Sequence, residues 1–259
     1  MLSYEISVLM AINKYDEYTS IAINSIIAQK AVDLQFVIVV NGSDRDNIYD
    51  ILYSQYGKFE NIYIIKTVVG QLASALNYGI DFCRSDYIAR MDSDDISHPL
   101  RLRKQLDYII LHNLDVVGAN IKKIDSIGET IGEVIYPQNR KINKMLIFKN
   151  PFCHPSVVFK KSIVLSMRGY NAGFASEDYE LWIRMDSRGQ NIKWDNIQEF
   201  LLEYRVHETG TQKNPLAYIE VFSFFIREFF LCFKAKYFLG AMLSLFKYIK
   251  EKVYSMRLK

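Results

Sequence analysis

Three aspartates crowd four positions in the stretch ARMDSDDI, residues 89–96. Asp92, Asp94 and Asp95 directly follow an apolar run that is typical of a buried strand. Carboxylates this close together raise one another's pKa unless a cation lies between them. A solvated turn is the alternative, since aspartate is favoured just before a helix and Pro99 follows. The stretch alone leaves a metal site and a turn both open.

A second acidic pair, Glu177 and Asp178, begins the stretch EDYELWIRM. Leu181, Trp182 and Met185 recur there at helical spacing, which predicts a helix with both acids in its first turn. A carboxylate beside another one on a partly apolar surface can have its pKa raised into the range of a general base. The helix dipole also favours acids at helix N-termini, so a purely structural role stays open. Trp182 is expected in the core.

Alternating apolar and helical patterns organise the first hundred residues. Continuous apolar runs predict strands buried on both faces at 6–11, within 36–44, at 61–66 and at 85–91, with helices between them. This alternation implies a parallel sheet, whose ligands bind at the carboxyl ends of the strands. Asn13, Asn41 and the aspartates from Asp92 to Asp95 all follow strand ends, so they are expected to share one edge.

The second half has a less regular pattern. We expect a helix at 99–113, a strand at 115–120, a hairpin at 121–137 and a polar helix at 138–147. A loop, NPFCHPS, and a short strand precede the acidic helix, and two further strands are expected within 192–205. His154 in that loop is a candidate for the lining of an acceptor site.

Composition and charge exclude several classes. Half of the 259 residues are hydrophobic, and only 12 Gly and 5 Pro occur, which favours one folded domain with at most an appendage. The three cysteines lack metal-ligand spacing and suggest a reducing compartment. The first ten residues show no signal-peptide pattern, so a cytoplasmic location is expected. No G-x-G-x-x-G follows a strand, which disfavours a dinucleotide oxidoreductase.

The C-terminal tail, residues 213–259, differs from the rest. It carries nine Lys or Arg and three Glu, a net charge of +6, whereas residues 1–212 carry −3. This is unlike a nucleic-acid binder and suits an anionic membrane surface. The uncharged run 237–246 is half the roughly 20 residues that span a bilayer. A helix or helical pair lying on the membrane is therefore expected, with a buried helix or a dimer interface as the alternative. One predicted face holds Glu220, Ser223, Arg227 and Lys234, and another holds Phe222, Phe225, Ile226, Phe229 and Phe233.

Six stretches in order resemble one enzyme family. They are SVLMAINK, VVNGSD, GQLASALNYGID, YIARMDSDDISHPLRLRKQ, HPSVVF and EDYELWIRM. Together they resemble the family 2 glycosyltransferases of bacterial O-antigen and exopolysaccharide assembly, including amylovoran-type enzymes. The resemblance implies a GT-A fold, an α/β fold with a Rossmann-like mixed sheet. It would comprise a nucleotide-binding half at 1–98 and an acceptor half at 99–212, followed by the helical tail.

The resemblance also implies roles for the acidic residues. Asp94 of the D-x-D motif would bind Mn²⁺ or Mg²⁺, and Asp92 would face the ribose or the metal. Asp95 is open between this site and a helix cap. His207, after the last core strand, would complete the metal site. Glu177 and Asp178 match the catalytic pair, with Asp178 as the base.

Donor-binding positions follow from the same match. Ala11, Asn13, Asn41, Arg90 and Ser93, with Asp92, are expected to contact the sugar nucleotide. Asn41 departs from the aspartate of many relatives, although an amide can still donate to and accept from a base. For Arg90 a surface or structural role is the alternative.

The implied reaction is inverting transfer of a hexose or N-acetylhexosamine. The donor would be a UDP-sugar, and the acceptor a polyprenyl-diphosphate-linked saccharide at the inner leaflet of the cytoplasmic membrane. A sugar nucleotidyltransferase is the enzymatic alternative, although no glycine-rich loop follows the first strand. A membrane-bound scaffold without activity is the non-enzymatic one.

Overall fold

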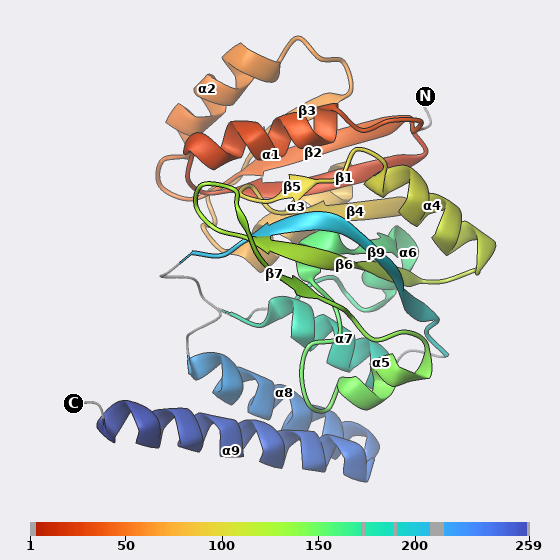
Figure 1. The fold of residues 1–259 in the computed structure, drawn as a ribbon, viewed down its shortest axis with the longest axis vertical. Coiled ribbons are helices and arrows are strands. Elements are labelled where there is room, and N and C mark those ends of the chain that lie inside the picture. The colour runs from red at the N-terminus through yellow and green to blue at the C-terminus, as the bar shows by residue number, and fades with distance from the viewer. Residues whose placement is uncertain (1–3, 172, 174, 189–190, 208–214, 258–259) are drawn as a thin grey trace.

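The computed structural model describes residues 4–171, 173, 175–188, 191–207 and 215–257 (Figure 1). The expected start of the tail, at residue 213, lies outside these ranges. The elements of the first half are β1 (Ile6–Ile12), α1 (Glu17–Ile27), β2 (Leu34–Val40), α2 (Arg45–Tyr56), β3 (Ile62–Lys66), α3 (Leu72–Phe82), β4 (Tyr87–Met91), β5 (Ile96–Ser97) and α4 (Arg101–Leu111). Those that follow are β6 (Val116–Ile124), β7 (Thr130–Val134), α5 (Arg140–Met145), the 3-10 turn η1 (His154–Ser156), β8 (Val158–Lys160), α6 (Lys161–Ser166), α7 (Glu177–Arg188), β9 (Trp194–Arg205), α8 (Leu216–Cys232) and α9 (Ala235–Arg257).

One mixed sheet runs through both halves of the chain in the order β3-β2-β1-β4-β8-β6-β9-β5, and β7 pairs with β6. β1 is parallel to β2 and β4, and β2 is parallel to β3. β8 then runs antiparallel to β4 and β6, while β6 and β9 are parallel. The carboxyl ends of β1, β2 and β4 consequently meet at one edge, as the sequence predicts. Asn13, Asn41 and Asp92 follow those ends.

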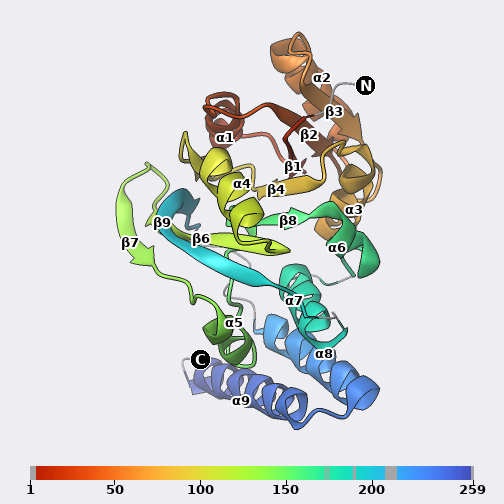
Figure 2. The same cartoon turned by 90° about the vertical axis from the view of Figure 1, so that its right-hand side faces the viewer.

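The sheet separates two apolar layers. Along β2, Phe36 and Ile38 pack with α1, α2 and α4, whereas Val37 and Val39 point to the other face and pack with α3. This alternation explains why the central strands are apolar at most positions on both faces. The second layer continues through α7, where Trp182 is fully buried, to α8 and α9. Figure 2 shows α7, α8 and α9 stacked in that order, with α9 outermost.

Three details differ from the sequence prediction. The two strands expected within 192–205 are a single strand, β9. It pairs with β6 from Trp194 to Arg205, and the pairing changes register on either side of Asn120, as at a β-bulge. The two-residue strand β5 and the short helix α6 were not expected, since segments of this length carry too little periodicity to be recognised.

The tail forms the expected helical pair, but its polar side is partly turned into the protein. Arg227 forms ion pairs with Glu180 and Glu228, and both acids are fully buried. Phe225 is buried as well, against Tyr237 of α9. No helix in the described part of the chain combines the length and the apolarity that crossing a bilayer requires.

Candidate active site

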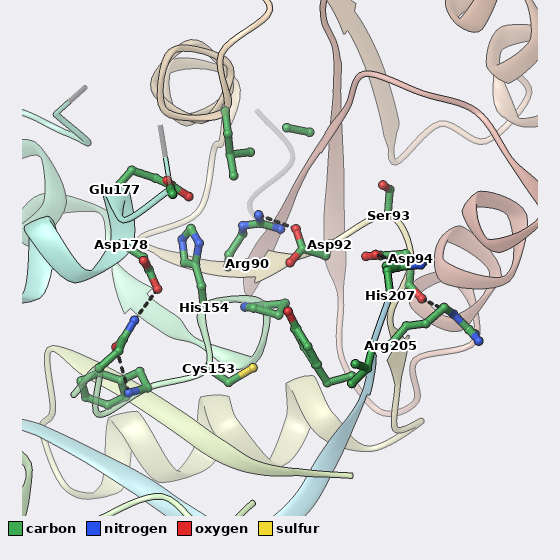
Figure 3. Close-up of a pocket in the computed structure, with 18 of the residues that line it drawn as sticks. Arg90, Asp92, Ser93, Asp94, Cys153, His154, Glu177, Asp178, Arg205 and His207 are labelled. Atoms are coloured by element: carbon green, nitrogen blue, oxygen red, sulfur yellow. Dashed lines mark hydrogen bonds and ion pairs between the residues drawn. The ribbon is translucent and has the colours of Figure 1, made fainter. Parts of the chain in front are cut away.

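A cavity of about 610 Å³ opens at the carboxyl edge of β1, β2 and β4. Figure 3 shows Glu177 and Asp178 on one side of it, Asp94 and His207 on the other, and Arg90 between them. The cavity is lined by every residue that the sequence analysis selected for donor, metal or catalytic roles: Ala11, Asn13, Asn41, Arg90, Asp92, Ser93, Asp94, Glu177, Asp178 and His207. Residues separated by more than a hundred positions in the chain are thus brought to one site.

The three aspartates after β4 form a compact cluster. Asp92, Asp94 and Asp95 each contribute one carboxylate oxygen to a group in which all three oxygens lie within 4.8 Å of one another. Burial raises the pKa of Asp94, and the charge of Asp92 raises it further. Burial also raises the pKa of Asp95 well above its ordinary value, with added repulsion from Asp92 and Asp94. Three oxygen donors that destabilise one another in this way fit a hard divalent cation.

Asp95 has a different role from the helix cap considered above. Its Oδ1 accepts a hydrogen bond of 2.9 Å from the backbone N–H of Arg205, at the end of β9. Its Oδ2 is buried and has no hydrogen-bond partner among the described protein atoms. The residue that caps α4 is Leu100. Asp95 therefore joins the acidic turn to β9 and directs one uncompensated oxygen toward the cluster.

His207 lies against the acidic cluster. Its Nε2 is 2.8 Å from Oδ2 of Asp94, and its ring centroid is 5.7 Å from that of Tyr18. The neighbouring Arg205 donates to the carbonyl oxygen of Asp94 at 2.9 Å and lies over the Tyr18 ring. The end of β9 thereby closes one side of the cavity and holds an imidazole beside a carboxylate.

Arg90 lies at the floor of the cavity, because the alternation along β4 directs its side chain inward. It is 2% exposed, so the surface role considered above is wrong. Its Nη2 is 2.5 Å from Oδ1 of Asp92. Nε and Nη1 have no hydrogen-bond partner among the described residues, and neither does the buried Oδ1 of Asn41. Buried polar atoms are rarely left without partners, which makes both residues candidates for ligand contact.

The second acidic pair occupies the first turn of α7. Burial raises the pKa of Glu177 to about 7, with a further contribution from the charge of Asp178. Burial also raises the pKa of Asp178, and hydrogen bonds oppose this shift. Those bonds come from the backbone N–H of Tyr179 at 2.7 Å and from the Asn150 amide at 2.6 Å. A half-buried carboxylate that is oriented by hydrogen bonds and has a raised pKa is suited to accepting a proton.

Several lining residues were not singled out from the sequence as site residues. Asn150 opens the loop NPFCHPS and orients Asp178, while Tyr136, Tyr204 and Arg205 complete the wall. His154, expected near the acceptor, lines the same cavity and shares a 2.9 Å hydrogen bond with Tyr170. Burial keeps the pKa of His154 well below its usual value, so the imidazole is neutral at pH 7. The sequence signal for Asn150 is its place four residues before His154 of the His-Pro stretch.

The fold and the site together define an α/β protein with an acidic cavity at the carboxyl edge of its sheet, and comparison with known proteins identifies its family. The model of the family described as Glycosyl transferase family 2 matches residues 7–164, more than half of the chain. The chain belongs to this family, as the resemblance in sequence indicated. Family membership also favours glycosyl transfer over the nucleotidyl-transfer alternative.

Individual relatives extend the match. The O-antigen biosynthesis glycosyltransferase WbnJ of Escherichia coli is 48% identical over 225 residues, covering 86% of this chain and 88% of that protein. The Escherichia coli UDP-Gal:alpha-D-GlcNAc-diphosphoundecaprenol beta-1,3-galactosyltransferase is 29% identical over 82% of this chain and 78% of its own. The mannosyltransferase PcManGT of Pyrobaculum calidifontis, solved with GDP-Man and Mn²⁺, superposes with a TM-score of 0.67 at 12% identity, covering 100% of this chain and 76% of that one. The expected GT-A fold is confirmed.

Proposed function

We propose that this protein is a metal-dependent, inverting glycosyltransferase that moves a sugar from a UDP-sugar to a lipid-linked saccharide in O-antigen biosynthesis. One observation carries the proposal. A single cavity holds a carboxylate cluster suited to a cation on one side and the acid pair Glu177 and Asp178 on the other, with Arg90 between them. Such a division suits a reaction in which a diphosphate leaves at one side and a hydroxyl attacks from the other.

Asp178 is the proposed general base. The acceptor hydroxyl attacks the anomeric carbon of the donor, and its proton passes to an Asp178 carboxylate oxygen. The bond from that carbon to the phosphate oxygen breaks, and the nucleoside diphosphate leaves with the electron pair. Attack opposite the leaving group inverts the anomeric configuration. Asn150 holds Asp178 in place, burial raises the pKa of Asp178, and burial together with the charge of Asp178 raises the pKa of Glu177.

Asp92, Asp94 and His207 are the proposed holders of Mn²⁺ or Mg²⁺. The oxygen-rich set fits both ions, and the imidazole favours Mn²⁺ over Mg²⁺. The bound cation would supply positive charge that neutralises the diphosphate of the donor. Ala11, Asn13, Asn41 and Ser93 line the part of the cavity where the nucleotide would lie. The unpaired nitrogens of Arg90 are available to a phosphate or ribose oxygen.

The acceptor part of the proposal is supported by the relatives. The galactosyltransferase named above acts on a sugar carried by diphosphoundecaprenol, and WbnJ takes part in O-antigen biosynthesis. We infer a polyprenyl-diphosphate-linked saccharide as the acceptor here. Because a polyprenyl carrier lies in the bilayer, we propose that the enzyme works at the inner face of the cytoplasmic membrane.

The test is transfer with a panel of UDP-, GDP- and dTDP-sugars and a short polyprenyl-diphosphate saccharide, with and without Mn²⁺. We expect one donor to be used, only with metal, with release of a nucleoside diphosphate. Asp94→Ala should abolish transfer and metal-dependent donor binding by calorimetry, and the exposed control Asp50→Ala should not. Release of pyrophosphate would instead reveal a nucleotidyltransferase. Full activity of Asp94→Ala would overturn the metal assignment.

A further inference from the structure

Exposed apolar side chains gather on the outer helical pair. At the turn between α8 and α9, Phe230, Leu231 and Phe233 are 64%, 60% and 75% exposed. Along α9, the exposed large apolar residues are Phe238, Leu239, Phe246, Ile249 and Val253. We call these eight residues the outer stripe. Their exposure is unusual for large apolar residues in one short segment, and contiguous apolar surface of this kind marks an interaction site.

The outer stripe is continuous. With about 100° per residue in an α-helix, the five α9 members fall within an arc of about 100°. The buried residues Tyr237, Ala241 and Ser244 lie on the opposite side of α9. Phe229 joins the turn to α9, because its ring centroid lies 5.4 Å from Phe230 and Phe238 and 6.0 Å from Phe233. α9 thus presents one apolar face to the protein and another away from it.

Lysines flank the outer stripe on both sides. On the same helical projection, Lys250 lies about 20° beyond one edge of the arc and Lys252 about 40° beyond the other, and Lys234 directly precedes the first residue of α9. All three are exposed, while Glu251 lies on the far side of the helix. Lysine side chains at such edges can extend their charges to phosphate headgroups while the apolar residues enter the acyl region.

The helical pair is fixed to the catalytic helix. Glu228 of α8 accepts from Arg188 of α7 at 2.7 Å and from Ser187 at 2.5 Å. Asp186 of α7 accepts from Lys236 at 2.6 Å and from the Tyr237 hydroxyl at 2.8 Å. Any surface that binds the outer stripe therefore also orients α7, and with it the cavity, relative to that surface.

We propose that the outer stripe docks this protein on an anionic lipid bilayer, with α9 lying in the interface plane. The proposal deepens the proposed function. Its biological purpose rests on the lipid-linked acceptor that was proposed there. A second copy of the chain is the competing occupant. A two-fold dimer through the stripe would bring identical lysine rims together, which opposes association, whereas anionic headgroups complement them.

The test is co-sedimentation of the full chain with vesicles, without donor, acceptor or metal. We expect binding to vesicles of equal parts phosphatidylcholine and phosphatidylglycerol, weak binding to pure phosphatidylcholine, and loss of binding in high salt. Phe246→Ser with Ile249→Ser should weaken binding at least tenfold. The control Leu111→Ser with Ile127→Ser changes two even more exposed apolar residues elsewhere and should bind like wild type. Thermal unfolding of each variant verifies that it is folded.

The lysine rim has its own variants. Lys250→Gln with Lys252→Gln should weaken binding about fivefold for each charge removed. The control Lys30→Gln with Lys58→Gln removes two exposed charges from the other half of the chain. Equal vesicle binding by wild type and the stripe variant would overturn the proposal. So would a dimer, seen by light scattering, that forms without lipid and is lost in the stripe variant. Because no sugar transfer is measured, this result is independent of the proposed activity.

Discussion

Helix α7 buries acidic side chains at two levels one turn apart, and the two levels differ in their partners. Glu177 and Asp178 face the cavity, and burial raises the pKa of both. Burial also pushes the pKa of Glu180 upward, but hydrogen bonds and charges of Arg184 and Arg227 outweigh it, and the pKa is lowered. Glu180 is thus a permanent anion that ties α7 to α8. The acids whose pKa burial raises can accept a proton, whereas the acid that two arginines hold in its charged form has a structural role.

The largest effect is expected at Asp178. Replacing Asp178 by Asn keeps the shape and removes the proton acceptor, so turnover should fall about 100- to 10,000-fold. The melting temperature should stay level or rise, because a buried charge is removed. Single-turnover transfer and thermal unfolding measure the two quantities. Near-normal turnover by a variant that still binds donor would rule out Asp178 as the base.

Glu180 should show the opposite behaviour. Glu180→Gln removes the carboxylate that pairs with Arg184 and one of the two that pair with Arg227, and breaking a buried pair costs about 3–5 kcal/mol. Urea unfolding should show this loss, while the folded fraction keeps a turnover close to that of wild type. Asp178→Asn, two residues away on the same helix, is the matched control. A Glu180→Gln protein with unchanged stability and lost turnover would show that Glu180 belongs to the same functional site as Glu177 and Asp178.

The pH dependence of stability distinguishes the levels further. The pKa of Glu177 is raised from 4.5 to about 7, so the folded protein binds more protons than the unfolded chain between these values. Stability must then fall as pH rises through this window. Glu177→Gln removes that loss, and it should stabilise the protein at pH 8 by up to about 3 kcal/mol and very little at pH 4. Urea unfolding at both pH values is the measurement. An equal change at both would show that Glu177 titrates normally.

Local patterns made the donor edge of the site predictable. Asn13, Asn41 and Asp92 each follow an apolar strand within a few residues, and parallel strands bring such ends together. The acidic start of α7 was equally visible from its helical periodicity. These features depend on sequence order and strand direction, which a single chain displays.

Contacts between distant segments were not predictable. Asp95 bonds to Arg205 across 110 positions, and Arg227 reaches Glu180 across 47. Periodicity identifies the polar face of α8 but not the buried anions that meet it. For the same reason the sequence showed an aromatic tail without revealing which aromatic residues stay exposed.

Asn150 provides the smallest and most specific test of the acid pair. Its amide hydrogen bond at 2.6 Å favours the charged form of Asp178 and so lowers its pKa against the effect of burial. Asn150→Ala should raise that pKa further and move the acid limb of the turnover profile to higher pH. Losing one hydrogen bond to a charged group is worth about 1.5–3 kcal/mol, or roughly one to two pH units. Turnover should therefore fall most on the acid side of the profile and recover toward wild type at high pH. A loss that is the same at every pH would mean that Asn150 supports only the position of the loop.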